Sequence, residues 1–391
     1  MKKLDLVLPT ILFVLLGFSV VSSATASSTI WSRIYEIGPP LEANSIIEIS
    51  DGGYAIAGRF GTHGDFWLIK IDELGDMQWN RTYGGEKKDV AFSLVETSDG
   101  GYALAGFTES FGQGEEDFWL VKTDADGIMQ WNRTYGGPES EEAYSLIQTS
   151  DGGYALAGYK QYSDVIISDF LVITRGPDFW VVKTDSNGNV VWNQTYGGKD
   201  IERAYSMVEA PDGGYVVAGS SRLVKIDSQG KTEWKQTYGG TSLVATSDGG
   251  YALAGKNLLI KTDAYGNMEW NQTHGGTSLV ATPDGGFAFL SGTSLIKTDS
   301  QGIVEWTERY ETNRHPVEEW PRLNSMIETS NGGYVIAGDV FDWFLGEGLI
   351  WVIKTDDYGV IPEFPSWTIL PLFLATTVSA IILKKRLFHK R

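Results

Sequence analysis

The residues that could perform acid–base or metal chemistry are few in this sequence. It contains no Cys, which excludes a thiol nucleophile, a disulfide framework and Cys-ligated zinc. The four histidines are His63, His274, His315 and His389, and no two have the spacing of metal ligands. The carboxylate pairs Glu115/Glu116 and Glu318/Glu319 could serve as general acid and base in a glycosidase or a lyase. Adjacent residues rarely converge on one bond, so the sequence favours a protein without catalytic activity over an enzyme.

Two acidic patterns raise the question of a bound cation. Asp124-Ala125-Asp126-Gly127 resembles the start of a calcium loop, but it lacks the closing Glu of such a loop. Ser93 and Glu96 have counterparts elsewhere in the chain, at Ser45, Ser145, Ser206, Ser242, Ser278 and Ser325, and at Glu48, Glu209 and Glu328. A ring of these carboxylates could hold a cation. We expect instead that the Ser hydroxyls bond to backbone groups and that the Glu side chains meet water, and we predict no metal site.

These residues belong to a unit that recurs seven times. Its signature is Asp/Asn-Gly-Gly-Tyr/Phe, starting at Asp51, Asp99, Asp151, Asp212, Asp248, Asp284 and Asn331. In the second unit the pattern predicts four short strands, over residues 93–97, 102–106, 118–123 and 129–135. A second motif, Asp-x-x-Gly-x-x-x-Trp, joins the third strand to the fourth, as at Asp124, Gly127 and Trp131.

The repeats predict an all-β fold. The chain has 391 residues with 13% aromatic residues and 47 Gly, which argues against both disorder and a mostly helical protein. Four antiparallel strands per unit, with units 36 to 61 residues apart, are typical of propeller blades. We therefore predict a seven-bladed β-propeller over residues 27–361.

The two ends of the repeat region predict how the ring closes. The seventh unit contains Asp356 and Gly359 but has Glu363 where the Trp of the motif should stand, so its fourth strand is missing. Residues 30–35, which contain Trp31 and Tyr35, match that missing strand. We expect this N-terminal strand to complete the last blade, which would leave no open sheet edge.

The Asp-x-x-Gly-x-x-x-Trp motif resembles the tryptophan-docking motif of quinoprotein-type propellers over residues 31–359, with one residue of difference in the Asp-to-Gly interval. The resemblance implies the blade architecture, with the Trp side chains packed between blades. We expect no cofactor, with calcium or a quinone as the alternatives.

A candidate binding surface is predicted on one face of the ring. Because strands alternate in direction, the second-to-third and blade-to-blade connections share a face. The second-to-third connections are long in units 7, 1, 2 and 3, which are neighbours in a closed ring. Long loops on a rigid scaffold commonly carry binding sites, and aromatic side chains stack on sugars or fill partner pockets. The candidate binding residues are Phe107, Phe111, Tyr159, Tyr162, His315, Trp320, Phe341 and Trp343.

Four Asn-x-Thr sequons occur on the predicted outermost strands, at Asn80, Asn132, Asn193 and Asn271. They are candidate glycosylation sites if the protein is exported. Duplication of one ancestral unit explains their recurrence equally well.

Both ends of the chain have the pattern of membrane-directed segments. Lys2 and Lys3 precede an apolar run that ends near small residues, which predicts a signal peptide over residues 1–26, with an uncleaved anchor as the alternative. Residues 367–383 are uncharged and precede the basic residues 384–391, which predicts a transmembrane helix followed by a cytoplasmic tail.

The residues before this apolar run carry a further resemblance. Pro362-Glu363-Phe364 resembles the PEF-type C-terminal sorting signal of archaeal surface proteins. The resemblance implies that a sortase-like transpeptidase exchanges the helix within residues 362–383 for another anchor. A retained transmembrane anchor is the alternative.

The charge of the chain bears on its partners. Without the first 26 residues, which carry +1, and the last eight, which carry +5, the formal net charge falls from -19 to -25. Such a body repels nucleic acid. The sequence predicts a membrane-anchored propeller at the cell surface that binds a protein or glycan partner, with an extracellular carbohydrate-active or quinone-dependent enzyme as the alternative. It does not predict an oligomeric state.

Overall fold

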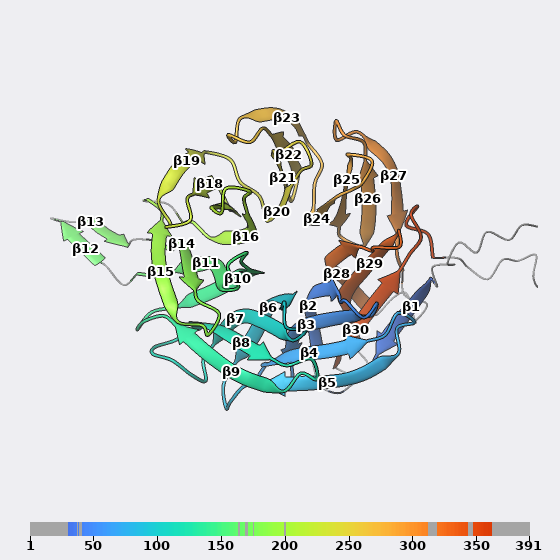
Figure 1. The fold of residues 1–391 in the computed structure, drawn as a ribbon, viewed down its shortest axis with the longest axis horizontal. Helices are drawn as coiled ribbons and strands as arrows, with labels where there is room; N and C mark the ends of the chain where they lie inside the picture. The colour runs from blue at the N-terminus through green and yellow to red at the C-terminus, as the bar shows by residue number, and fades with distance from the viewer. Residues whose placement is uncertain are drawn as a thin grey trace, which may run out of the picture.

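The chain forms a closed ring of seven sheets, each with four antiparallel strands (Figure 1). The computed structural model describes residues 30–36, 38, 41–162, 165–168, 171–174, 176–198, 201–311, 319–342 and 347–361. The predicted seven-bladed β-propeller is confirmed. The predicted signal peptide, sorting motif, transmembrane helix and tail lie outside the described residues. Within those described ranges, no helix is long and apolar enough to cross a membrane.

The first four blades each contain four consecutive strands of the ring. Blade 1 comprises β2 (Leu41–Glu48), β3 (Tyr54–Phe60), β4 (Asp65–Ile71) and β5 (Met77–Tyr83). Blade 2 comprises β6 (Asp89–Glu96), β7 (Tyr102–Thr108), β8 (Asp117–Thr123) and β9 (Met129–Tyr135). Blade 3 comprises β10 (Glu141–Gln148), β11 (Tyr154–Lys160), β14 (Asp178–Thr184) and β15 (Val190–Tyr196). Blade 4 comprises β16 (Ala204–Glu209), β17 (Tyr215–Gly219), β18 (Leu223–Ile226) and β19 (Thr232–Gln236).

The remaining blades are blades 5 and 6 and the one that closes the ring. Blade 5 comprises β20 (Ser242–Ala245), β21 (Tyr251–Gly255), β22 (Leu258–Thr262) and β23 (Met268–Gln272). Blade 6 comprises β24 (Thr277–Ala281), β25 (Phe287–Ser291), β26 (Ser294–Thr298) and β27 (Val304–Arg309). Blade 7 comprises β28 (Glu319–Glu328), β29 (Tyr334–Asp342), β30 (Glu347–Lys354) and β1 (Trp31–Tyr35). A separate hairpin, β12 (Val165–Ser168) with β13 (Leu171–Thr174), belongs to the long connection of blade 3.

Ring closure by the N-terminal strand is confirmed. β1 pairs antiparallel with β30, with Trp31 opposite Lys354 and Tyr35 opposite Ile350. The indole nitrogen of Trp351 donates a 2.8 Å hydrogen bond to the hydroxyl of Ser32. Blade 7 therefore combines strands from the two ends of the described chain.

The apolar core lies between neighbouring blades. One cluster packs Ile56 and Trp67 of blade 1 against Val335 and Val352 of blade 7, and six further clusters follow around the ring. The middle strands β7, β8 and β14 are buried along their whole length because each blade has a neighbour on both of its faces.

A Trp–Gly contact joins every pair of neighbouring blades. The Trp of one blade packs on the Gly in the third-to-fourth turn of the next, where an added Cβ would lie 2.6–3.0 Å from the ring. The seven pairs are Trp31–Gly75, Trp79–Gly127, Trp131–Gly188, Trp192–Gly230, Trp234–Gly266, Trp270–Gly302 and Trp306–Gly359. These Gly residues also have φ between 72° and 81°, so both the backbone and the packing require Gly.

The Asp that begins each of these turns stabilises the turn itself. In the former calcium-loop candidate, Asp124 accepts hydrogen bonds from the amides of Asp126 and Ile128. A second bond links the blades: the Tyr at the end of the fourth strand donates to the carbonyl of the same Gly in the next blade, as Tyr135 does to Gly188. His274 replaces this Tyr in blade 5 and makes the same contact with Gly302 at 2.8 Å.

In six blades the first-to-second turn is held by a Lys on the third strand, which is buried in blades 2 to 6 and half-buried in blade 1. The pairs are Lys70–Asp51, Lys122–Asp99, Lys183–Asp151, Lys225–Asp212, Lys261–Asp248 and Lys297–Asp284, at 2.5–2.9 Å. The hydrogen bond from Thr149, together with the Lys183 ammonium, lowers the pKa of Asp151 to about 2 against the opposing effect of burial. In blade 7, Asn331 stands where the other blades have Asp, and burial lowers the pKa of its Lys354.

We expect Asn331→Asp to raise the free energy of unfolding by about 1 kcal/mol, because it would supply a carboxylate near a buried Lys that is only 1% exposed. Thermal and urea unfolding at pH 7 measure the change. The matched variant Asp151→Asn, which removes a carboxylate from the same repeat position, should lower stability. A lower stability for Asn331→Asp would contradict the prediction.

A candidate ligand pocket at the centre of the ring

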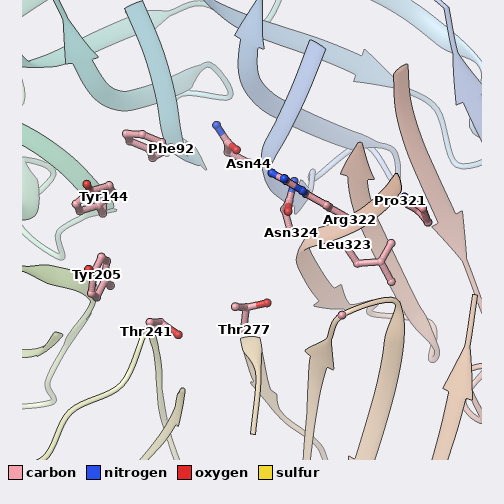
Figure 2. Close-up of a pocket in the computed structure, with 11 residues that line it drawn as sticks. Asn44, Phe92, Tyr144, Tyr205, Thr241, Thr277, Pro321, Arg322, Leu323 and Asn324 are labelled. Atoms are coloured by element: carbon pink, nitrogen blue, oxygen red, sulfur yellow. The ribbon is translucent and has the colours of Figure 1, made fainter. Parts of the chain in front are cut away.

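A pocket of about 480 Å³ lies at the centre of the ring (Figure 2). Each blade contributes one residue from, or directly before, its first strand: Asn44, Phe92, Tyr144, Tyr205, Thr241, Thr277 and Asn324. Gly292, Pro321, Arg322 and Leu323 complete the lining. Gly292 belongs to the second-to-third connection of blade 6, so the pocket opens on the face that carries the long connections.

Backbone bulges position most of these residues. In blades 1, 2, 3, 4 and 7 the pairing of the first two strands skips one residue, which is Asn44, Phe92, Tyr144, Tyr205 or Asn324. In blade 3, for example, Ala143 pairs with Gly158 and Ser145 with Ala157. A bulge redirects a side chain out of the normal alternation of a strand. The five skipped residues all line the central pocket.

One side of the pocket is an aromatic wall made of Phe92, Tyr144 and Tyr205 (Figure 2). The ring centroids are 5.0 Å apart for Phe92 and Tyr144 and 5.3 Å apart for Tyr144 and Tyr205. The hydroxyl of Tyr144 donates to Glu142 at 2.9 Å. The wall therefore presents mainly ring surface to the pocket.

Two amides continue the lining, with Asn44 next to Phe92 and Asn324 beyond it (Figure 2). The amide nitrogen of Asn44 donates to the carbonyl of Ala91 at 2.9 Å, and that of Asn324 donates to the carbonyl of Ala43 at 2.9 Å. Asn324 also donates to Asp339 at 2.5 Å. Burial raises the pKa of Asp339 to about 6 despite this hydrogen bond. Both amide oxygens are available to a ligand as acceptors, and the nitrogen of Asn44 keeps one N–H that makes no hydrogen bond among the described residues.

Arg322 is the only residue of the lining with a formal charge. Its side chain is exposed, and its nitrogens point toward Asn44 and Asn324 in Figure 2. Within the described residues, no carboxylate forms an ion pair with it. The pocket thus combines ring surface, hydrogen-bond acceptors and one cation, and its chemistry is that of a binding site.

Two of the aromatic candidates from the sequence, Phe107 and Tyr159, pack against the residues that line this pocket. Phe107 and Tyr159 are 2% and 4% exposed, which differs from the expected surface position. They pack behind the aromatic wall, with Phe107 5.9 Å from Phe92 and Tyr159 6.1 Å from Tyr144. Both residues are buried because the first strand of the next blade packs on the strand that carries them, β10 on β7 and β16 on β11. A direct binding role for these two residues remains a prediction.

The other candidates are more peripheral. Phe111 is 43% exposed and packs 5.3 Å from Trp119, while Tyr162 and Phe341 are half-buried. Trp320 lies in β28 opposite Phe341, and its side chain lies outside the described part of the chain. His315 and Trp343 are likewise outside it.

Sequence reasoning did not select the pocket residues as a set. The sequence does contain a pattern that marks them. Each of the seven pocket residues directly precedes the recurring Ser of the first strand, and the residue type varies at this position although the surrounding motif recurs.

The recurring Ser and Glu residues hold the blades together. Six Ser hydroxyls accept hydrogen bonds of 2.7–3.2 Å from backbone amides of an adjacent blade, which confirms the role expected for Ser. Three of the Glu side chains bind the turn of the preceding blade instead of meeting only water: Glu96 binds Ser50, Glu209 binds Ser150 and Glu48 binds Ser330. Among the described residues, no group of three or more His, Cys, Asp or Glu side chains could hold a metal ion.

Glu328 departs from this arrangement. The corresponding turn residue of blade 6 is Pro283, which has neither an amide hydrogen nor a hydroxyl to donate. Burial, reinforced by the negative charge of Asp284, raises the pKa of Glu328. Pro283 thus leaves Glu328 without the turn hydrogen bonds that Glu48, Glu96 and Glu209 make.

Buried carboxyl groups also meet at blade junctions outside the pocket. Asp117 and Glu141 are 2% and 0% exposed, and an added Cβ at Gly136 would lie 1.8 Å and 2.5 Å from their oxygens. Glu141 accepts hydrogen bonds from Lys160 and from the amide of Gly137. Burial, followed by the negative charge of Glu141, raises the pKa of Asp117 to about 6. The pair is enclosed by the blade connection, which favours a structural role.

We expect Asp117→Asn to stabilise the protein at neutral pH. The folded state retains a proton on Asp117 that the unfolded chain loses near pH 4, so wild-type stability should fall between about pH 4 and pH 6. The variant should lose this decline and gain roughly 1–2 kcal/mol at pH 7.5. Urea unfolding across this pH range measures it, with the exposed Asp126→Asn as the control. An equal pH dependence in wild type and Asp117→Asn would contradict the expectation.

The four sequon residues lie on the fourth strands, as predicted. Asn132, Asn193 and Asn271 are exposed, and Asn80 is half-buried. The amide oxygens of Asn132 and Asn193 accept from the indoles of Trp119 and Trp180 at 3.3 Å. Glycosylation at these positions remains a prediction.

Comparison with known proteins supports the fold alone. No protein-family model matches the sequence, and no curated protein matches it. The chain is similar to the Pan2 WD40 domain of Neurospora crassa, with a TM-score of 0.55 and 10% identity over 80% of this chain and 89% of that one. It is also similar to the extracellular domain of the putative one-component system BT4673 from B. thetaiotaomicron, with a TM-score of 0.51 and 13% identity over 82% of this chain and 42% of that one. A third similar structure is BBS1N in complex with ARL6DN, with a TM-score of 0.51 and 8% identity over 84% of this chain and 93% of that one.

Proposed function

We propose that the protein is a cell-surface propeller that binds a glycan or a protein partner at its central pocket. In this proposal residues 1–26 direct export, residues 362–383 provide the membrane anchor or the sorting signal that replaces it, and the propeller lies outside the cell. The protein acts as a binding module without chemistry of its own.

The variation of the seven pocket residues carries the proposal. The positions that hold the blades together repeat around the ring, including the Trp–Gly contacts and the Lys–Asp pairs. The pocket position instead holds Asn, Phe, Tyr or Thr. Packing between blades does not require different residues at this position. A ligand that has different chemical groups on its different sides does require them.

Partner classes are supported by separate observations. The aromatic wall and the amide acceptors suit a glycan. The similar structure of BBS1N is itself a complex with ARL6DN, which supports a protein as the other class.

A glycan array and a pull-down with soluble residues 27–361 test the proposal. Tyr205→Ala should abolish or strongly weaken any binding found, because it removes one third of the aromatic wall. A second variant replaces residues 161–177 of blade 3 by the two-residue turn Lys256-Asn257 of blade 5, and it should still bind. Loss of binding only in the second variant would move the site to the loops and overturn the proposed pocket.

A further inference from the structure

We propose that the pocket recognises one acidic sugar residue, a pyranose ring that carries a carboxylate, as part of a sparsely charged glycan. This inference rests on the proposed function and names the ligand class of the same pocket. The juxtaposition that carries it is an aromatic wall, two amide acceptors and one guanidinium that line the same pocket.

The aromatic wall selects a ligand with a flat face of C–H groups. Phe92, Tyr144 and Tyr205 form a continuous row with centroids 5.0 Å and 5.3 Å apart. The buried rings of Phe107 and Tyr159 support the row from behind, so it is held in place before a ligand arrives. Pyranose rings stack on such surfaces through their C–H faces.

The amides select hydroxyl groups of the ligand. Asn44 and Asn324 each donate an N–H to the backbone of the next blade, which fixes both amides with their oxygens available as acceptors. Thr241 and Thr277 add exposed hydroxyls to the same pocket. A sugar ring supplies several hydroxyl donors around one small ring, whereas a peptide segment of the same size supplies fewer.

Arg322 selects the carboxylate. A guanidinium pairs with a carboxylate through two parallel hydrogen bonds, which gives both affinity and orientation. Among the described residues, Arg322 has no carboxylate at ion-pair distance. Glu42 pairs with Arg59 at 2.7 Å. Asp339 lies opposite Arg322 in the sheet, accepts a hydrogen bond from Asn324 and interacts with Arg322 only through the attraction of the two charges. The strongly acidic body repels polyanions, which favours an isolated acidic residue over a densely charged polymer.

The size and the opening of the pocket agree with this ligand. Its volume of about 480 Å³ lies within the roughly 300–1,000 Å³ of small-molecule sites. At blades 5 and 6, where the connections are short, Thr241, Thr277 and Gly292 are exposed. A glycan chain can therefore leave the pocket on that side while one residue stays inside.

Calorimetric titration of the propeller with methyl β-D-glucuronide, methyl β-D-galacturonide and the two matching neutral glycosides tests the inference. At least one uronide should bind about tenfold or more tightly than its neutral counterpart, as expected for a charge-assisted hydrogen bond. Arg322→Gln should remove this preference, and the exposed Arg33→Gln on the outer strand β1 is the matched control. Tyr205→Ala should weaken both glycosides, whereas Tyr205→Phe should retain them. Near-UV circular dichroism confirms that each variant is folded.

The possible failures can be told apart. Equal binding of uronides and neutral glycosides would overturn the acidic-sugar inference and leave the proposed pocket intact. No glycoside binding, together with a protein partner whose capture depends on Tyr205, would also overturn it in favour of a protein ligand. Binding on an array or in a pull-down that neither Arg322→Gln nor Tyr205→Ala affects would overturn both the inference and the proposed function.

Discussion

Removal of residues 30–36 is expected to lower the free energy of unfolding by about 4 kcal/mol or more and to promote aggregation. The deletion takes β1 out of blade 7 and exposes the edge of β30. It removes Trp31, which is 8% exposed, and truncation of a buried aromatic alone costs roughly 3–5 kcal/mol. It also removes the hydrogen bond from Tyr35 to the carbonyl of Gly75. Thermal unfolding and light scattering measure the two effects.

Two point variants make this test specific to ring closure. Trp31→Ala should account for most of the loss, because Trp31 packs on Gly75 and contacts Tyr54. Arg33 lies on the same strand, but it is exposed, and its one ion pair, with the exposed Asp76, is long at 3.9 Å. Arg33→Ala should therefore change the free energy of unfolding by less than about 0.5 kcal/mol. An unchanged melting temperature after the deletion would show that β1 does not close the ring.

Gly158→Ala is expected to destabilise the protein by about 3 kcal/mol or more and to disrupt the pocket. Gly158 lies in β11, the second strand of blade 3, opposite the bulge, and an added Cβ would lie 1.8 Å from the carbonyl oxygen of Glu142. Backbone atoms cannot move aside as easily as a flexible side chain, so the cost exceeds ordinary overpacking. The forced shift occurs directly before Tyr144, which should therefore leave its place in the aromatic wall.

The chain contains a matched control for this substitution. Gly255 occupies the same repeat position in blade 5, where the first two strands pair without a bulge. An added Cβ there would meet only the Cα of Gly240, at 3.8 Å. Gly255→Ala should leave the melting temperature nearly unchanged. Similar losses for Gly158→Ala and Gly255→Ala would show that the bulge is not the reason for Gly at position 158.

The fold could be predicted from sequence because its determinants recur. Trp131 and Gly127 appear at the same spacing in successive units, and Trp31 at the N-terminus matches the one strand missing from the last unit. Each of these residues acts through packing between blades that is nearly the same at every junction. Repetition therefore supplied evidence for the fold that a single copy could not.

The pocket could not be predicted by the same reasoning because it lies where the strand pattern breaks. The predicted first strand of blade 2 covered residues 93–97, whereas β6 runs from Asp89 to Glu96. The missed part contains Phe92, the residue that the sheet pairing skips. In a regular strand, side chains alternate between the two faces of the sheet, and a skipped residue does not fit this alternation. The sequence pattern therefore placed such a residue outside the predicted strand. The burial of Phe107 and Tyr159 was missed for a related reason, since it depends on the neighbouring blade.

The bulges have a consequence for how this protein could change over time. A skipped residue takes no part in the register of the sheet, so its side chain can be exchanged while the ladder on either side stays the same. The five skipped residues, Asn44, Phe92, Tyr144, Tyr205 and Asn324, are therefore positions at which ligand preference can change separately from folding. A combinatorial library confined to the skipped aromatic residues Phe92, Tyr144 and Tyr205 should yield mostly folded proteins with altered specificity. Natural selection would have had the same freedom, so relatives of this propeller would be expected to diverge first in what they bind.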